Sequence, residues 1–141
     1  MSPQTIDDVP VGIKTRVTKT VSESDVYLFA GITGDLDPNH VDEEYCRHTS
    51  LGHRVAHGAL IVGYTSAAST RILQDFDRPM VSVGYDRIRF LKPVYFGDTL
   101  TIEYEITGIE REKERTVAKI EVKNQNEELV AVLTHIMQLV T

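Results

Sequence analysis

The second half of the chain alternates between apolar and polar residues. Four segments show this alternation or are rich in β-branched residues, and turn-forming residues separate them. A period of two residues is typical of strands with one buried face. The pattern therefore predicts four strands. In an earlier segment, residues 11–21, β-branched residues also alternate with polar ones, which predicts a fifth strand. The five predicted strands cover residues 11–21, 80–90, 99–107, 115–122 and 128–139.

Two longer helices are predicted before the last four strands, and residues 42–47 between them can form a short turn of helix. The first begins after Ser22, whose side chain can form a capping box with Asp25, and it ends by Gly34. The second covers residues 59–73 and is apolar on nearly every face, which is typical of a central helix wrapped by a sheet. Small residues would let neighbouring backbone approach this helix closely: Ala59, Gly63, Ala67 and Ala68.

Helices followed by an antiparallel sheet indicate the α+β class. The 141 residues are enough for one sizeable core, and no repeat or low-complexity linker divides them. With 41% hydrophobic and 26% charged residues, the composition is ordinary for a globular protein. We therefore predict one domain over residues 1–141.

The net charge of −6 argues against nucleic acid or an anionic membrane as the main partner. The longest uncharged run, residues 55–70, is too short for a membrane span. The first residues lack the basic start and apolar core of a signal peptide, so we expect a cytoplasmic protein. Cys46 is the single cysteine, which excludes an intrachain disulfide.

Asp35 and His40 are the strongest candidates for a catalytic pair. Asp35 can accept a proton and His40 can donate one. Pro38 between them stiffens the turn, so both side chains could face one water molecule. The alternative is ordinary turn chemistry, in which Asp37 or Asn39 caps a short helix.

Gly58 opens the predicted central helix. A glycine at this position lets a substrate carbonyl approach unpaired backbone N–H groups at the positive end of the helix dipole. Such a site stabilises an enolate-like oxygen. Together with Asp35 and His40, it points to adding water to, or removing it from, a carbonyl-activated carbon chain.

These residues carry a family resemblance. The segment from Phe29 to His40, followed by Ala56-His57-Gly58, resembles the hydratase 2 motif of MaoC-like, (R)-specific enoyl-CoA hydratases. Residues 90–100 also resemble the strand, turn and strand of that family, and the resemblance covers most of the chain. It implies a single MaoC-like hot-dog domain, in which a curved antiparallel sheet wraps a long central helix.

The resemblance also implies an activity and roles for residues. The activity is hydration of trans-2-enoyl-CoA to (R)-3-hydroxyacyl-CoA, and the reverse dehydration. Asp35 and His40 would activate the water, and the Gly58 backbone would bind the thioester oxygen. The family usually has asparagine where this chain has Asp37, which we expect to cap the turn or face solvent. Supporting roles fall to Ser66, His57 and Asn39.

Coenzyme A enters as part of the substrate, and no other cofactor is expected. Its phosphates need a basic patch, for which Arg87, Arg89 and Lys92 are candidates, although these charges could equally face solvent on a strand. The family implies a homodimer, or a higher oligomer built from dimers, which would also cover the open sheet edge.

Three alternatives remain open at this point. Cys46 lies among four histidines, but the chain has no Cys-x-x-Cys pair, and no metal is expected. Hot-dog folds also host acyl-CoA thioesterases, and a non-catalytic acyl-CoA binding module is the last alternative. The acyl tunnel could be lined by Tyr27, Leu28 and Tyr64.

Overall fold

The protein is described by a computed structural model that covers residues 2–141. One antiparallel sheet of five strands has the order β1-β3-β4-β5-β2, which confirms the predicted α+β class. The strands are β1 (Lys14–Thr20), β2 (Met80–Phe90), β3 (Thr99–Glu110), β4 (Arg115–Lys123) and β5 (Leu129–Leu139).

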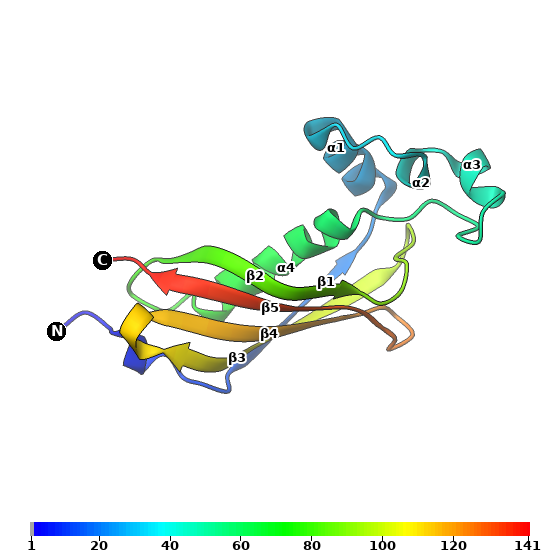
Figure 1. The fold of residues 1–141 in the computed structure, drawn as a ribbon. Coiled ribbons are helices and arrows are strands. Elements are labelled where there is room, and N and C mark those ends of the chain that lie inside the picture. Colours follow the sequence, from blue (N-terminus) through cyan, green and yellow to red (C-terminus); the bar gives the residue numbers. More distant parts are fainter. Residues whose placement is uncertain (1) are drawn as a thin grey trace.

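A long helix lies along one face of this sheet, and three shorter helices project beyond one end of it (Figure 1). The long helix is α4 (Gly58–Ile72), and the projecting ones are α1 (Glu23–Thr33), α2 (Pro38–Val41) and α3 (Glu43–Arg47). Two 3-10 turns, η1 (Ile6–Asp8) and η2 (Arg111–Lys113), complete the elements.

The alternation along the strands decides which face of the sheet is buried. In β3, for example, Leu100, Ile102, Tyr104 and Ile106 have no exposed surface, whereas the residues between them are partly exposed. Burial of this apolar face is the main driving force that holds the helix on the sheet.

Helix α4 packs on β1 and β3, and only one of its faces is buried. Ile61, Thr65 and Ala68 form that face. We predicted that neighbouring backbone approaches this helix closely at its small residues. This prediction is wrong for Gly63, because an added Cβ there would meet nothing within 4 Å. In this chain the sheet covers α4 from one side, so the small residues of its other face stay exposed.

The ends of α1 follow the sequence signals. The Ser22 hydroxyl accepts a hydrogen bond of 3.0 Å from the Asp25 N–H. Gly34 ends the helix with a φ of 80°, a left-handed conformation that glycine adopts without strain. Helix α2 was predicted only as the short capped helix of the alternative to a catalytic turn, because four residues are too few to show a helical period.

Strand β2 forms one edge of the sheet, and it departs from regular pairing with β5 at two places. Arg87 has a positive φ of 54° at the second of these irregularities. Val81 and Val83 are exposed on this strand. Among residues 2–141, no helix combines the length and the hydropathy that crossing a bilayer requires.

Candidate active site

The segment between α1 and α2 carries Asp35 away from the sheet. Asp37 caps α2, since its carboxylate accepts a hydrogen bond of 2.9 Å from the Asn39 N–H. Pro38 occupies the first turn of α2, where its missing N–H is no loss. The alternative of a capped turn is therefore confirmed for Asp37, and this turn presents Asp35 and His40 on the same side.

Asp35, His40 and His57 come together at this turn. Their carboxylate oxygen and ring nitrogens lie within 4.8 Å of one another. His40 Nδ1 lies 2.7 Å from the carbonyl oxygen of Val55. A carbonyl can only accept a hydrogen bond, so Nδ1 carries the proton and Nε2 is the nitrogen left to exchange protons.

His57 is buried behind this pair. Its Nε2–H donates a hydrogen bond of 3.0 Å to the carbonyl oxygen of Asp35. Its ring stacks on His40, with the centroids 3.7 Å apart, and the ring of Phe29 packs on it at 4.7 Å. His57 thus connects the backbone of one candidate catalytic residue to the ring of the other.

Gly58 is the first residue of α4, so its N–H has no carbonyl partner within the helix. A Cβ at this position would lie 2.7 Å from the exposed Phe90 ring, so a larger residue would require a shift of this ring or of the start of α4. Gly58 and Asn39 line a cleft of about 390 Å³ beside the site. The Asn39 carbonyl accepts from the Val55 N–H at 2.9 Å and so supports the Val55–His40 contact.

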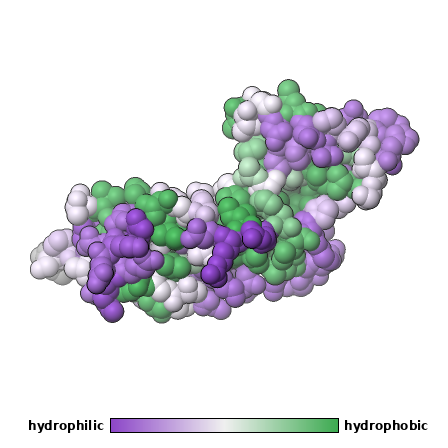
Figure 2. All heavy atoms as spheres, in the orientation of Figure 1, coloured by the Kyte–Doolittle hydropathy of each residue, from purple (hydrophilic) through white to green (hydrophobic). Residues whose placement is uncertain are grey.

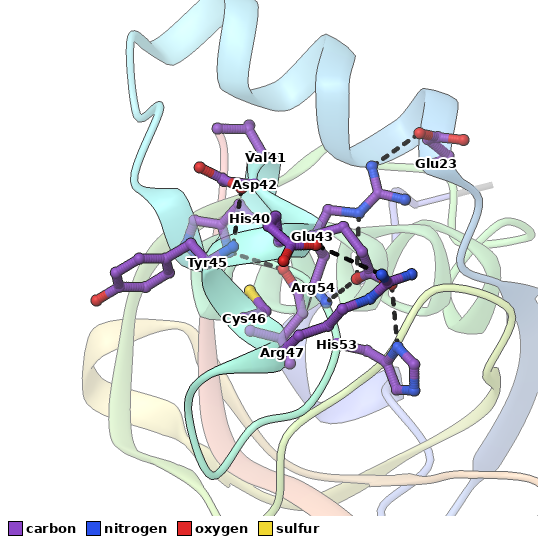
Figure 3. A network of polar contacts seen from close by, with 12 residues as sticks. Glu23, His40, Val41, Asp42, Glu43, Tyr45, Cys46, Arg47, His53 and Arg54 are labelled. Atoms are coloured by element: carbon purple, nitrogen blue, oxygen red, sulfur yellow. Dashed lines mark hydrogen bonds and ion pairs between the residues drawn. The ribbon is translucent and has the colours of Figure 1, made fainter.

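A polar network holds the segment that carries His40 (Figure 3). The Glu43 carboxylate accepts from the Arg54 backbone N–H at 3.0 Å. The Arg54 guanidinium donates to Glu23 at 2.9 Å and to the Tyr27 hydroxyl at 2.8 Å. His53 hydrogen-bonds to Glu43, and this bond holds the pKa of Glu43 below its usual range. The network joins α1, α3 and the residues before Val55.

The remaining predicted site residues lie apart from the pair. Ser66 is exposed and lines a different cavity, two turns along α4, so its supporting role stays a prediction. Lys92 lines the cleft at Gly58 and forms an ion pair with Glu128. Arg87 and Arg89 are exposed on β2 and do not line this cleft, so their role in binding coenzyme A stays a prediction.

The cluster of Asp35, His40 and His57 does not have the shape of a metal site. An ion binds in the plane of an imidazole ring, but the two ring planes are stacked with an angle of 26° and do not converge on one point. Cys46 is buried in α3 and donates weakly to the Asn39 carbonyl, and burial raises the pKa of its thiol. That no metal is bound stays a prediction.

Some supporting residues had no signal in the sequence. Val55 acts through its backbone carbonyl, which any residue would supply, and Phe90 meets Gly58 from a strand far away in the chain. Arg54 and Glu43 show only a charge pattern ordinary for a solvent-exposed face. These residues become recognisable only when the fold brings α3 next to the loop that carries Arg54.

Comparison with known proteins decides the family. Residues 7–129 match the sequence profile of the MaoC like domain. The chain belongs to this family of hydratases and dehydratases. It is 39% identical over 108 residues to the (R)-specific enoyl-CoA hydratase of Rhodospirillum rubrum, a match that covers 76% of this chain and 72% of that protein.

Two further relatives agree with this membership in the MaoC family. The 3-hydroxybutyryl-CoA dehydratase of Methylorubrum extorquens is 33% identical over 109 residues, covering 77% of this chain and 68% of that one. The structure of the R-hydratase PhaJ1 from Pseudomonas aeruginosa aligns with a TM-score of 0.84 at 30% identity, over 96% of this chain and 84% of that one. The predicted MaoC-like hot-dog fold is confirmed.

Proposed function

We propose that this MaoC-family enzyme hydrates trans-2-enoyl-CoA thioesters to (R)-3-hydroxyacyl-CoA and catalyses the reverse dehydration. The observation that carries the proposal is the meeting of Asp35 and His40 beside the first residue of α4. A base and an acid then meet at His57, and the next residue, Gly58, has an N–H without a partner in the helix. The activities named for the two relatives from Rhodospirillum rubrum and Methylorubrum extorquens support this reaction.

In the hydration direction, the Asp35 carboxylate takes a proton from water while the water oxygen forms a bond to C3 of the substrate. His40 Nε2 gives a proton to C2. This step needs the doubly protonated ring, because Nδ1 keeps its own proton on the Val55 carbonyl.

As the water oxygen adds to C3, electrons of the double bond shift toward the thioester carbonyl, and negative charge develops on its oxygen. The N–H of Gly58 can hold this oxygen at the positive end of the α4 dipole. Glycine keeps this backbone free of a Cβ, which would press against the Phe90 ring. Coenzyme A enters as part of the substrate, and we propose that the reaction uses no further cofactor.

The coenzyme A part of the substrate would lie along the cleft that Gly58 and Lys92 both line. Apolar side chains line most of this cleft, which suits the uncharged arm of coenzyme A, and the Lys92 ammonium stands at its rim. Lys92 would exchange its ion pair with Glu128 for a phosphate. Arg87 and Arg89 stay weaker candidates, because they do not line this cleft.

We also propose a homodimer formed through the β2 edge. Edge strands expose unpaired backbone groups that can pair with a second copy. Val81, Val83 and Phe90 of β2 are exposed, together with Leu91 after it. Apolar side chains also gather on the projecting helices, which stand away from the body in Figure 2. Exposed apolar residues at a free edge favour pairing of two sheets.

The test follows the double bond and the thiol separately. Purified enzyme is mixed with crotonyl-CoA, and loss of the enoyl-thioester absorbance is recorded in parallel with free thiol. We expect loss of the double bond without thiol release. Thiol release would instead indicate a thioesterase, and no change in either signal with any enoyl-CoA would contradict the proposed reaction.

Variants assign the base. Asp35→Asn should lower the hydration rate by about a hundredfold to ten-thousandfold, the usual contribution of a positioned general base. Asp37→Asn is the matched control, because asparagine caps a helix as well as aspartate does. Near-normal activity of Asp35→Asn would exclude Asp35 as the base.

A further inference from the structure

A second cavity lies between α4 and β2, at the end of α4 away from Gly58. Its volume is about 490 Å³. One wall is α4 from Ser66 onward, the other is the first half of β2, and His135 of β5 contributes to the lining. Hydroxyl groups are frequent in this lining: Ser66, Ser69, Thr70, Ser82 and Tyr85.

Three residues form a hydrogen-bonded chain at this cavity. His135 is 1% exposed, and its Nε2 lies 2.8 Å from the Ser82 hydroxyl oxygen. Its Nδ1 lies 2.8 Å from the hydroxyl of Tyr104, which is completely buried. The Tyr85 ring stacks on His135 with centroids 4.5 Å apart. The ring of His135 is therefore fixed on both nitrogens and on one face.

The direction of the hydrogen bonds follows from the burial. Burial lowers the pKa of His135, so the ring is neutral and carries one N–H. Among the described residues, the hydroxyl of Tyr104 contacts only His135 Nδ1. If Nδ1 carried the proton, the Tyr104 O–H would be buried without an acceptor, which is unfavourable. Tyr104 therefore donates to Nδ1, and Nε2–H donates to Ser82.

This arrangement leaves the hydroxyl hydrogen of Ser82 free. Ser82 already accepts from His135, and it lines the cavity, so its own O–H is directed to whatever occupies that space. A hydrocarbon chain there would bury the hydroxyl without a partner, at a free-energy cost. A ligand with an acceptor oxygen avoids this cost. Asp77 and Arg78 also line the cavity, but their side chains are hydrogen-bonded to backbone groups of Gln4 and Val140. Ser82 therefore offers a neutral donor to a polar atom of a ligand.

The cavity and the candidate active site lie at opposite ends of α4. Helix α4 and strand β2 run in opposite directions (Figure 1), so that Phe90 meets Gly58 at one end and Ser82 faces the C-terminal part of α4 at the other. Ser66 follows Gly58 by eight residues, which is a distance of about 12 Å along a helix. A thioester held at Gly58 could therefore send a medium-length acyl chain into the cavity.

We propose that the cavity binds the distal part of an acyl group that carries a hydroxyl or carbonyl oxygen, and that Ser82 donates a hydrogen bond to this oxygen. The inference rests on the proposed function, since it assigns the substrate class of that reaction. It makes Ser82 the residue that distinguishes oxygenated from plain acyl chains, with His135 and Tyr104 as positioning residues that orient its hydroxyl.

The experiment measures binding and turnover separately. Dissociation constants are measured by calorimetry for octanoyl-CoA and for its analogue with a hydroxyl group near the chain end. Rates are measured for octenoyl-CoA, its hydroxylated analogue and crotonyl-CoA. We expect the wild type to favour the hydroxylated chain by about fivefold to tenfold in both comparisons, the effect of one neutral hydrogen bond. Ser82→Ala should remove this preference.

The control variant is Ser24→Ala, which changes an exposed serine on α1 and should keep the wild-type ratio. Equal or weaker binding of the hydroxylated chain by the wild type would overturn the inference, as would a preference that persists in Ser82→Ala. Failure of the proposed function gives a different result, because crotonyl-CoA would then stay unchanged. The calorimetric ratio tests the cavity in either case.

Discussion

The imidazole rings of His40 and His57 stack with their centroids 3.7 Å apart, and a different backbone carbonyl orients each ring. His40 is fixed by Val55, which directly precedes the Ala56-His57 pair, and His57 is fixed by Asp35. The positions of the candidate base and acid are therefore coupled through His57. A change at this buried ring should disturb both.

The first prediction concerns this coupling. His57→Phe keeps a ring for the stack but loses the N–H that holds the Asp35 carbonyl. We expect kcat for crotonyl-CoA hydration to fall by about a hundredfold, the effect of a small misplacement of reacting groups, with a smaller change in KM. The pH–rate profile should also shift, because a polar neighbour of His40 is lost.

Phe29→Leu is the control for His57→Phe. It alters the packing on the other side of His57 without touching the hydrogen bond to Asp35, and it should keep the wild-type pH profile. If His57→Phe had the wild-type kcat and pH profile, His57 would have no positioning role.

The second prediction concerns the space at Gly58. Gly58→Ala would place its Cβ 2.7 Å from the Phe90 ring, so either the ring or the start of α4 must move. We expect hydration to fall by about tenfold or more, because the N–H proposed to bind the thioester oxygen is displaced. The double variant Gly58→Ala, Phe90→Ala should recover part of the loss, as measured by kcat/KM.

Gly63→Ala is the matched control on the same helix. A Cβ at Gly63 meets open space, and alanine favours a helix by about 1 kcal/mol over glycine. This variant should be as active as the wild type and more stable in urea unfolding. A Gly58→Ala variant that is fully active would contradict the role of this position.

The third prediction concerns Arg54, whose side chain is 20% exposed. Arg54→Lys keeps the charge but loses the planar group that contacts Glu23 and Tyr27 and packs on the Phe96 ring. We expect the free energy of unfolding to fall by about 1–3 kcal/mol, as for other hydrogen bonds to charged groups. Urea unfolding measures the change.

The control for Arg54→Lys is Arg47→Lys. Arg47 pairs with Glu44 on the exposed surface of α3, where such pairs contribute less than about 1 kcal/mol. Equal stability of the two variants would mean that the network around Arg54 does not hold the projecting helices.

The fourth prediction is a pH dependence of stability caused by His135. Burial lowers its pKa in the folded protein, whereas an unfolded histidine titrates near about pH 6.5. Between these two values the unfolded state binds more protons, so stability rises with pH and is lost as the pH falls below about 6.5. His135→Gln should lose less Tm than the wild type between about pH 7.5 and pH 5.5. His48→Gln, at an exposed position, should respond like the wild type.

Local signals in the sequence were enough for most of the fold. The alternation in β4, the Ser22 cap and the Gly34 stop predicted where elements begin and end, because each depends on residues close together in the chain. The one-sided packing of α4 was not predicted, since composition cannot tell whether a small residue faces a neighbour or open space. The spacing of the motif likewise predicted that Asp35 and His40 lie close together. The carbonyl of Val55 and the ring of Phe90 act through contacts that only the folded chain reveals.

The last prediction tests the β2 edge as the proposed dimer interface. Lysine on an edge strand prevents pairing with a second edge, because two copies bring like charges together. Val83 is 45% exposed on β2, so Val83→Lys should fold normally and raise the dissociation constant of the dimer by about tenfold or more. Val11→Lys is the control, since Val11 is 53% exposed but lies outside β2. Sedimentation equilibrium measures both. A monomeric wild type, or a dimer of unchanged strength in Val83→Lys, would place the interface elsewhere or exclude it.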